Sequence, residues 1–327
     1  MAIREVSLLY FALRRLAFAV PLIFIVVVIN FLLVHMAPGD PAYMIYGGGG
    51  YLPPEIVASI RHDFGLDKSL AEQFYLYITN MLQGNFGFSY AFRAPVLSVI
   101  AGRLPATMLL VLSALGLMIV FGIFFGVSSA KKPYSIRSNA ITAVSLAGYS
   151  LPEFLIGQIL IILFAITLGL FPTGGMYSVR GEFNTIVDVL WHLALPAVSL
   201  AFGGLAIISR LTRASMLESL HQDYIVTARA KGLSERSVLY RHAFRNAMLP
   251  VITVISLRLS AMLAGDLLIE VVFSWPGLGR LLFDAMSKRD FPVIQGMFFL
   301  ISVTVVTVTL FTDIIYARLD PRIRYSK

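Results

Sequence analysis

Residues 104–130 of this chain contain no charged side chain and form an apolar run long enough to cross a membrane as a helix. A helix satisfies its own backbone hydrogen bonds, so it is stable where no water is present. Hydrophobic residues make up 58% of the chain and charged residues 13%, against about a quarter charged in soluble domains. The sequence therefore predicts an all-α protein that crosses the membrane several times.

Six apolar runs are predicted to span the membrane. The third lies in a longer apolar run, residues 139–171, which contains Pro152. Proline should kink or break a helix, so we expect a tilted or interfacial start before the span itself. The first follows a basic start, as in a signal peptide, but it is long and no small-residue cleavage site follows, which favours an uncleaved span. The predicted spans are residues 16–36, 104–130, 154–170, 192–209, 251–273 and 291–312.

The basic residues indicate how these spans are oriented. Segments assigned to the cytoplasm hold about twice as many Lys and Arg residues as those assigned outside, which follows the positive-inside rule and places both termini in the cytoplasm. The net charge of +8 is also compatible with nucleic-acid binding, but the basic residues lie where membrane topology puts them, so no nucleic-acid partner is predicted. The chain has no cysteine, which excludes disulfides and cysteine metal sites.

The first long polar segment, residues 37–103, is predicted to lie outside the cytoplasm. Within it, residues 55–64 and 70–82 have the pattern of short amphipathic helices. Four consecutive glycines at 47–50 are not followed by the Lys-Ser/Thr pair that a phosphate-binding loop needs, so they indicate a loop only.

The second polar segment, residues 210–250, is strongly basic. It predicts a helix over residues 223–230 that stops at Gly232, because glycine supplies the left-handed conformation common at helix ends. A second helix is predicted over residues 235–248, ending before Pro250. On these residues alone, a basic loop that only fixes orientation is an equal alternative to a docking element.

Several motifs give the sequence a family resemblance. The segment DYIVTARAKGL, with RHAFRNAMLP behind it, resembles the cytoplasmic loop of ABC-importer permeases of the dipeptide/oligopeptide/nickel group. FLLVHMAPGDP, RLPATMLL, GYSLPEF and FSWPGLG resemble further segments of the same permeases in the same order, so the resemblance covers nearly the whole chain. Gly232 keeps the place of the family glycine, whereas Val226, Thr227 and Ala228 replace the usual Glu-Ala-Ala, so no role of that glutamate carries over.

The resemblance implies the function and the partners. It implies an all-α fold with six spans, in which spans two to six, within residues 104–327, form a type I (MetI-like) permease core. Residues 1–103 would be an added N-terminal helix and extracytoplasmic segment. The chain would be one permease subunit of an ATP-driven peptide importer in a prokaryotic inner membrane and would form half of the pore. It would assemble with a second permease, two ABC ATPase subunits and an extracytoplasmic substrate-binding protein. ATP and magnesium would belong to the ATPase chains, and no cofactor is expected here.

The same resemblance assigns candidate site residues. The loop at 210–250 would contain the coupling helix that docks on the ATPase, and the glycine-proline turn after the fifth span would lie at the outer gate, near the binding-protein face. The ATPase-coupling residues are Asp223, Tyr224, Thr227, Ala228, Arg229, Ala230, Lys231 and Gly232. The outer-gate residues are Glu270, Ser274, Trp275, Pro276, Gly277 and Gly279.

The fifth span carries three ionisable residues, Arg258, Asp266 and Glu270, at spacings that place them near one face of a helix. They are candidates for a polar pore lining. In the alternative interpretation, Asp266 and Glu270 lie near the outer interface of the membrane and have a structural role. No catalytic constellation or metal-ligand spacing is visible. The alternatives that remain open are an importer of nickel or another small solute, a proton-coupled secondary transporter using Asp266 or Glu270, and a passive channel.

Overall fold

The computed structural model describes residues 8–36, 53–63, 65, 67–89, 91–178, 185–263 and 266–319. Within these ranges the chain is mostly helical, with one short antiparallel pair of strands, β1 (Phe88–Ser89) and β2 (Ala94–Pro95). The predicted all-α class is therefore confirmed. The chain forms two compact units: the first comprises Met1–Met108, Ala264–Val271 and Pro276–Ile314, and the second comprises Leu109–Leu263, Val272–Trp275 and Ile315–Lys327.

The first unit holds the N-terminal helices and the helices near the C-terminus. Its buried apolar core joins the start of α5 to α13 and α14, through Val96, Leu281 and Val293 among others. The elements are α1 (Leu8–Met36), α3 (Pro54–Asp63), α4 (Leu70–Leu82), the beginning of α5 (Val96–Lys131), α12 (Leu267–Val272), α13 (Leu278–Lys288) and most of α14 (Phe291–Leu319).

Helices α3 and α4 confirm the two amphipathic helices expected in the first polar segment. Helix α4 begins at a capping box: Glu72 N–H donates to Ser69 Oγ at 3.4 Å, and Ser69 N–H donates to the Glu72 carboxylate at 3.1 Å. These two bonds satisfy backbone donors that a helix start otherwise leaves free. The Ser69 hydrogen bonds also lower the pKa of Glu72.

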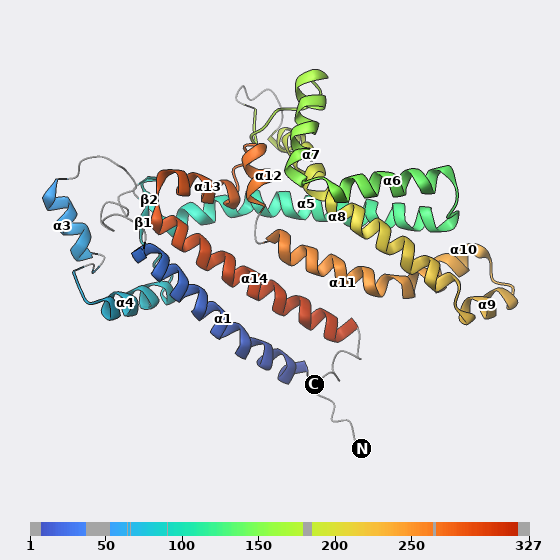
Figure 1. Cartoon of the computed structure of the whole chain (residues 1–327), viewed down its shortest axis with the longest axis horizontal. Helices are drawn as coiled ribbons and strands as arrows, with labels where there is room; N and C mark the ends of the chain where they lie inside the picture. Colours follow the sequence, from blue (N-terminus) through green and yellow to red (C-terminus); the bar gives the residue numbers. More distant parts are fainter. Residues whose placement is uncertain are drawn as a thin grey trace, which may run out of the picture. The chain divides into compact units, whose positions relative to one another are not determined.

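The second unit is arranged around α8, which packs against α6, α7 and α11 (Figure 1). Its long helices present apolar side chains to one another, and shorter helices connect them at the polar end. The elements are the rest of α5, α6 (Ile136–Ser150), α7 (Glu153–Leu160), the π-helical η1 (Ile161–Thr167), α8 (Thr185–Leu220), α9 (Asp223–Ala230), α10 (Glu235–Ser237), the π-helical η2 (Val238–Ala243) and α11 (Phe244–Leu263).

The predicted break at Pro152 is present. Helix α6 ends at Ser150, Leu151 is extended, and α7 starts after Pro152 with its axis turned by 109°. Proline disfavours the helical conformation of the residue before it and provides no N–H for the preceding turn. The bend is held by Ser199 of α8, whose hydroxyl donates to the Glu153 carbonyl at 2.8 Å.

Two expectations about the chain after residue 234 are wrong. The second loop helix does not end before Pro250, because α11 runs through that proline to Leu263 after the π-helical η2. A proline removes one backbone hydrogen bond, and neighbouring packing can compensate for that loss in a buried or membrane helix. The fifth run is also not one helix, because α11 ends at Leu263 and α12 begins separately at Leu267.

Helix length and composition identify fewer candidate spans among the described residues than the six predicted. Among the described residues, three helices are long and apolar enough to cross a membrane: Val96–Lys131, Thr185–Leu220 and Phe291–Phe311. The bent pair Ile136–Ser150 and Glu153–Thr167 makes a fourth if it is one span, and α1 contains the shorter apolar helix Val20–Leu32. The count of six spans stays a prediction.

Candidate functional site

Helix α9 is the first candidate site, and it forms where the loop helix was predicted. It starts after Gln222, whose backbone is extended, and ends at Lys231. Its side chains divide into two sets: Ile225 and Ala228 are buried, whereas Asp223, Tyr224, Thr227, Arg229 and Ala230 are exposed. Buried side chains one turn apart hold the helix against η2, which leaves the opposite face open.

The end of α9 depends on Gly232. Its φ angle of 77° lies in the left-handed region, and its N–H donates to the Arg229 carbonyl at 2.9 Å. A Cβ at this position would meet no atom within 4 Å, so the backbone conformation rather than crowding is what favours glycine. The next helix, α10, begins after its N-cap Ser234, whose hydroxyl accepts from Ser237 N–H.

An ion pair connects the two sides of this turn. Arg229 Nε donates to Glu235 Oε1 at 2.8 Å and Arg229 Nη2 donates to Oε2 at 3.3 Å. The hydrogen bonds from Arg229 lower the pKa of Glu235, and the same pairing raises the pKa of Arg229. Both side chains remain largely exposed to solvent, so the pair orients the turn more than it stabilises the fold.

A cleft lies beside α9 within the second unit. Its volume is about 650 Å³, and basic and apolar side chains share its walls. Lys131 Nζ donates to Tyr240 Oη at 2.8 Å across one side of it. The lining residues are Lys131, Leu220, Arg229, Glu235, Arg236, Leu239 and Tyr240.

The second candidate site is the turn around Glu270, which the first unit buries almost completely. The Glu270 carboxylate accepts from Thr107 Oγ1 at 2.6 Å and from Arg280 N–H at 3.0 Å, and it also accepts from Gly279 N–H. Thr107 Oγ1 in turn accepts from Leu278 N–H at 2.8 Å. The free N–H groups at the start of α13 are thus satisfied by a carboxylate and a hydroxyl from two other helices.

Gly277 makes this cap possible. A Cβ on Gly277 would overlap the carboxyl group of Glu270, so a larger residue would push the carboxylate away from the helix start. Pro276 precedes it and fixes the entry into the turn. The predicted glycine-proline turn is therefore a close-packed helix cap in the first unit.

The residues before this turn belong to the second unit. Phe273 is buried and its carbonyl accepts from Gly175 N–H at 2.8 Å. Ser274 has φ of 52°, an uncommon conformation for a residue with a side chain, and Trp275 is completely buried. In this structure the indole of Trp275 is not exposed to a partner protein.

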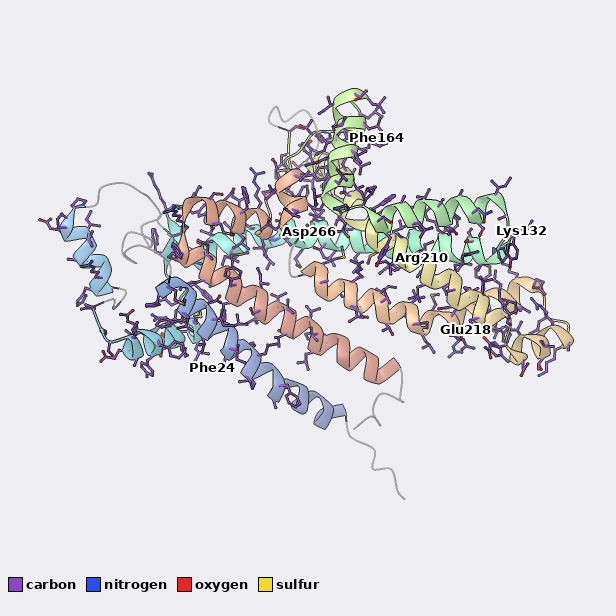
Figure 2. The ribbon with its side chains drawn as sticks, in the orientation of Figure 1. Phe24, Lys132, Phe164, Arg210, Glu218 and Asp266 are labelled. Carbon is purple, nitrogen blue, oxygen red and sulfur yellow. The ribbon has the colours of Figure 1, made fainter. Side chains whose placement is uncertain are left out.

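The three ionisable residues of the fifth run do not share one helix. Arg258 is half-buried on α11, whereas Asp266 stands just before α12 (Figure 2). Asp266 Oδ1 accepts from Ile269 N–H at 3.1 Å, as a helix N-cap does. Asp266 therefore has the structural contact that was considered for it, and the single helix on which the common face was predicted is interrupted before Asp266.

Sequence reasoning missed two groups of polar residues. Thr107 lies in the RLPATMLL motif, but nothing in the sequence pairs it with Glu270. Asp188 is buried on α8, where it accepts from Ser178 N–H at 2.7 Å and Ser178 Oγ at 2.6 Å and lies 3.2 Å from His192 Nδ1. The sequence did hold one signal of this contact, because Asp188 and His192 are four residues apart and so lie on one face of a helix. Among the described residues, no group of three or more His, Asp or Glu side chains could hold a metal ion.

Two known protein families match this chain over nearly its whole length. Residues 122–325 match the family "Binding-protein-dependent transport system inner membrane component", and residues 8–111 match the N-terminal family of such membrane components. Among solved structures, a chain of the MetNI methionine ABC transporter gives a TM-score of 0.45 at 15% identity, over 69% of this chain and 94% of that chain. A likeness of that size carries no argument about this chain.

Three curated relatives cover almost all of this chain. The oligopeptide transport system permease protein AppB of Bacillus subtilis is 41% identical over 96% of this chain and 99% of its own length. The di/tripeptide transport system permease protein DppB of Pseudomonas aeruginosa is 40% identical, and the glutathione transport system permease protein GsiC of Escherichia coli is 38% identical. Each of these two alignments covers 98% of this chain and 100% of the relative. The chain therefore belongs to the family of binding-protein-dependent transport system inner membrane components.

Proposed function

We propose that this chain is one of two permease subunits of an ATP-driven importer of peptides. The observation that carries the proposal is the near-complete alignment, at 38% to 41% identity, with permeases named for oligopeptides, for di- and tripeptides and for glutathione. All three names describe peptide substrates of different lengths. The shared substrate class is therefore a short peptide, and the binding protein would set its length.

Helix α9 is the proposed contact with the ATPase. Its exposed face carries Tyr224, Thr227 and Arg229, and the buried Ile225 and Ala228 attach it to the rest of the unit. ATP can bias a pore only by binding more favourably to one of its states, and a rigid, anchored helix transmits such a bias. Ala228 would contribute by anchoring α9, while the exposed residues would touch the partner.

The assembly would contain a second homologous permease, two ABC ATPase subunits and an extracytoplasmic binding protein. Both termini of this chain would be cytoplasmic, and α9 with the cleft beside it would then lie on the ATPase side. ATP and magnesium would be bound by the ATPase chains. The carboxylate cap formed by Glu270 and Thr107 would hold the turn at the outer gate, and the buried Trp275 would shape that region from within.

Uptake of labelled peptides tests the proposal. The chain is deleted from its host and restored on a plasmid, and import of labelled di-, tri- and pentapeptides is measured beside a labelled sugar and nickel. We expect peptide import to be lost on deletion and restored by the wild-type chain. Import of nickel or the sugar with no effect on any peptide would contradict the substrate class.

A matched variant tests the coupling role. Proline cannot adopt the positive φ of Gly232, so Gly232→Pro disrupts the turn after α9. Gly169→Pro is the matched control, because it replaces another positive-φ glycine outside the loop at 210–250. We expect Gly232→Pro to abolish ATP-driven uptake while the complex remains assembled in the membrane. Normal uptake by that variant would remove α9 from the coupling pathway.

A further inference from the structure

A second groove in the same unit has no role in the proposed import cycle. It lies between the end of α5, α6 and α8, and its volume is about 690 Å³. Its apolar lining includes Ile141 and Leu146 of α6 and Ile207 and Leu217 of α8, and its basic lining is Arg210 and Arg213 of α8. Among the described residues that line the groove, none is acidic.

Within the described residues, neither arginine forms an ion pair with a carboxylate. Arg213 Nη2 donates to the Pro133 carbonyl at 3.2 Å, while its Nε is buried without a hydrogen-bond partner in the described part of the chain. Arg210 lies over the ring of Tyr149, with its guanidinium carbon 5.9 Å from the ring centroid. A guanidinium has five donors, so both side chains can still bind an anion in the groove.

The groove also lies at a defined depth. Residues 193–209 of α8 carry no charge and Arg210 is the first charged residue after them, just as Lys131 follows the uncharged residues 104–130 of α5. Both helices thus change from apolar to basic at the level of the groove. A membrane helix makes this change where hydrocarbon meets the headgroups.

We propose that this groove binds one anionic phospholipid. Its phosphate would lie between Arg210 and Arg213, and an acyl chain would lie against the apolar side chains that line the groove. Charge complementarity favours an anionic lipid over a neutral one, because two guanidiniums line the groove and no carboxylate is among its described lining residues. The chemistry required is a phosphodiester attached to acyl chains, which phosphatidylglycerol and cardiolipin both supply. The inference rests on membrane placement and is independent of the peptide substrate.

Lipid retention measures this binding directly. The full chain is purified with its co-purifying subunits, incorporated into nanodiscs of equal parts phosphatidylglycerol and phosphatidylcholine, and released for native mass spectrometry. We expect phosphatidylglycerol to be retained in preference to phosphatidylcholine. Arg210→Gln, at an exposed position that leaves the core intact, should lower its retention about fivefold, which corresponds to ~1 kcal/mol for one basic contact.

Two further variants make the test specific. Lys132→Gln removes the same charge from the exposed turn between α5 and α6, apart from Arg210 (Figure 2), and should leave retention unchanged. Ala214→Trp fills the groove from its exposed rim without changing charge and should lower retention. Equal retention of both lipids by the wild type, equal losses in the Lys132 and Arg210 variants, or normal retention by Ala214→Trp would each overturn the proposal. So would displacement of the lipid by inorganic phosphate alone, because acyl contacts would then contribute nothing.

Discussion

Thr107 Oγ1 on α5 lies 2.6 Å from the carboxylate of Glu270 on α12, although 163 positions separate the two residues in the sequence. Both side chains are buried, and together they satisfy the first N–H groups of α13. A buried carboxylate is costly unless hydrogen bonds surround it, and here one hydroxyl and two backbone donors do so. The bond therefore holds three helices of the first unit at one point.

Thr107→Val removes this bond while keeping the side-chain shape. Leu278 N–H loses its acceptor and Glu270 loses a donor, and leaving buried groups unsatisfied costs about 1–3 kcal/mol. We expect a lower melting temperature of the purified complex. Thr309→Val, at an exposed position of α14 where the hydroxyl only donates to the Val305 carbonyl, is the matched control and should change little. Equal melting temperatures for the two variants would show that the cap does not stabilise the unit.

Substitutions of Gly232 should reduce the coupling of ATP hydrolysis to transport by graded amounts. Its φ of 77° costs other residues roughly 1–2 kcal/mol, less for asparagine, and is closed to proline. No neighbouring atom restricts a side chain there, so the order of defects should follow the backbone cost alone. We expect ATP-driven uptake to fall in the order Gly, Asn, Ala, Pro at equal amounts of assembled complex. A defect that grew with side-chain volume instead would indicate a partner surface pressed against this turn.

Substitutions of two neighbouring residues distinguish the attachment of α9 to the rest of its unit from the contact of α9 with a partner. Ile225 is fully buried, so Ile225→Ala should destabilise the attachment of α9 by about 2–5 kcal/mol, seen as faster proteolysis of the loop. Val226 is 62% exposed, so Val226→Ala should leave proteolysis unchanged. If α9 docks on an ATPase, the Val226 variant should still lower the ATPase activity stimulated by binding protein. Unchanged stimulation would place the contact elsewhere on α9.

The Arg229–Glu235 pair predicts a pH dependence of known sign. Because Arg229 lowers the pKa of Glu235 in the folded protein, the pair contributes its stability above the usual glutamate pKa, about 4.3. That contribution is lost as the pH falls through the lowered value. The difference in melting temperature between wild type and Glu235→Gln should thus be small and constant from pH 8 to about 5. It should shrink only in more acidic buffer, and a difference that grew on acidification would contradict the pairing.

Several local features followed from the sequence alone. Pro152 separates α6 from α7, Gly232 adopts a left-handed conformation that glycine tolerates best, and α4 begins at a Ser69–Glu72 capping box formed by neighbouring residues. Each depends on atoms within a few residues of one another. The uncharged runs, likewise, were enough to predict membrane helices because hydrocarbon excludes charge regardless of the fold.

Other features were decided by tertiary structure. Pro250 lies inside α11 where a helix end was expected, and Asp266 caps a new helix where one continuous span was expected. The burial of Glu270 and Trp275, the partner of Thr107 and the pairing of Asp188 with Ser178 depend on segments that the sequence does not place side by side. The sequence determined most of the helices and the apolar runs long enough to cross a membrane, since those preferences act over one or two turns. Only the packed structure decided which polar groups meet, because a buried charge accepts whichever donors the fold brings within hydrogen-bond distance.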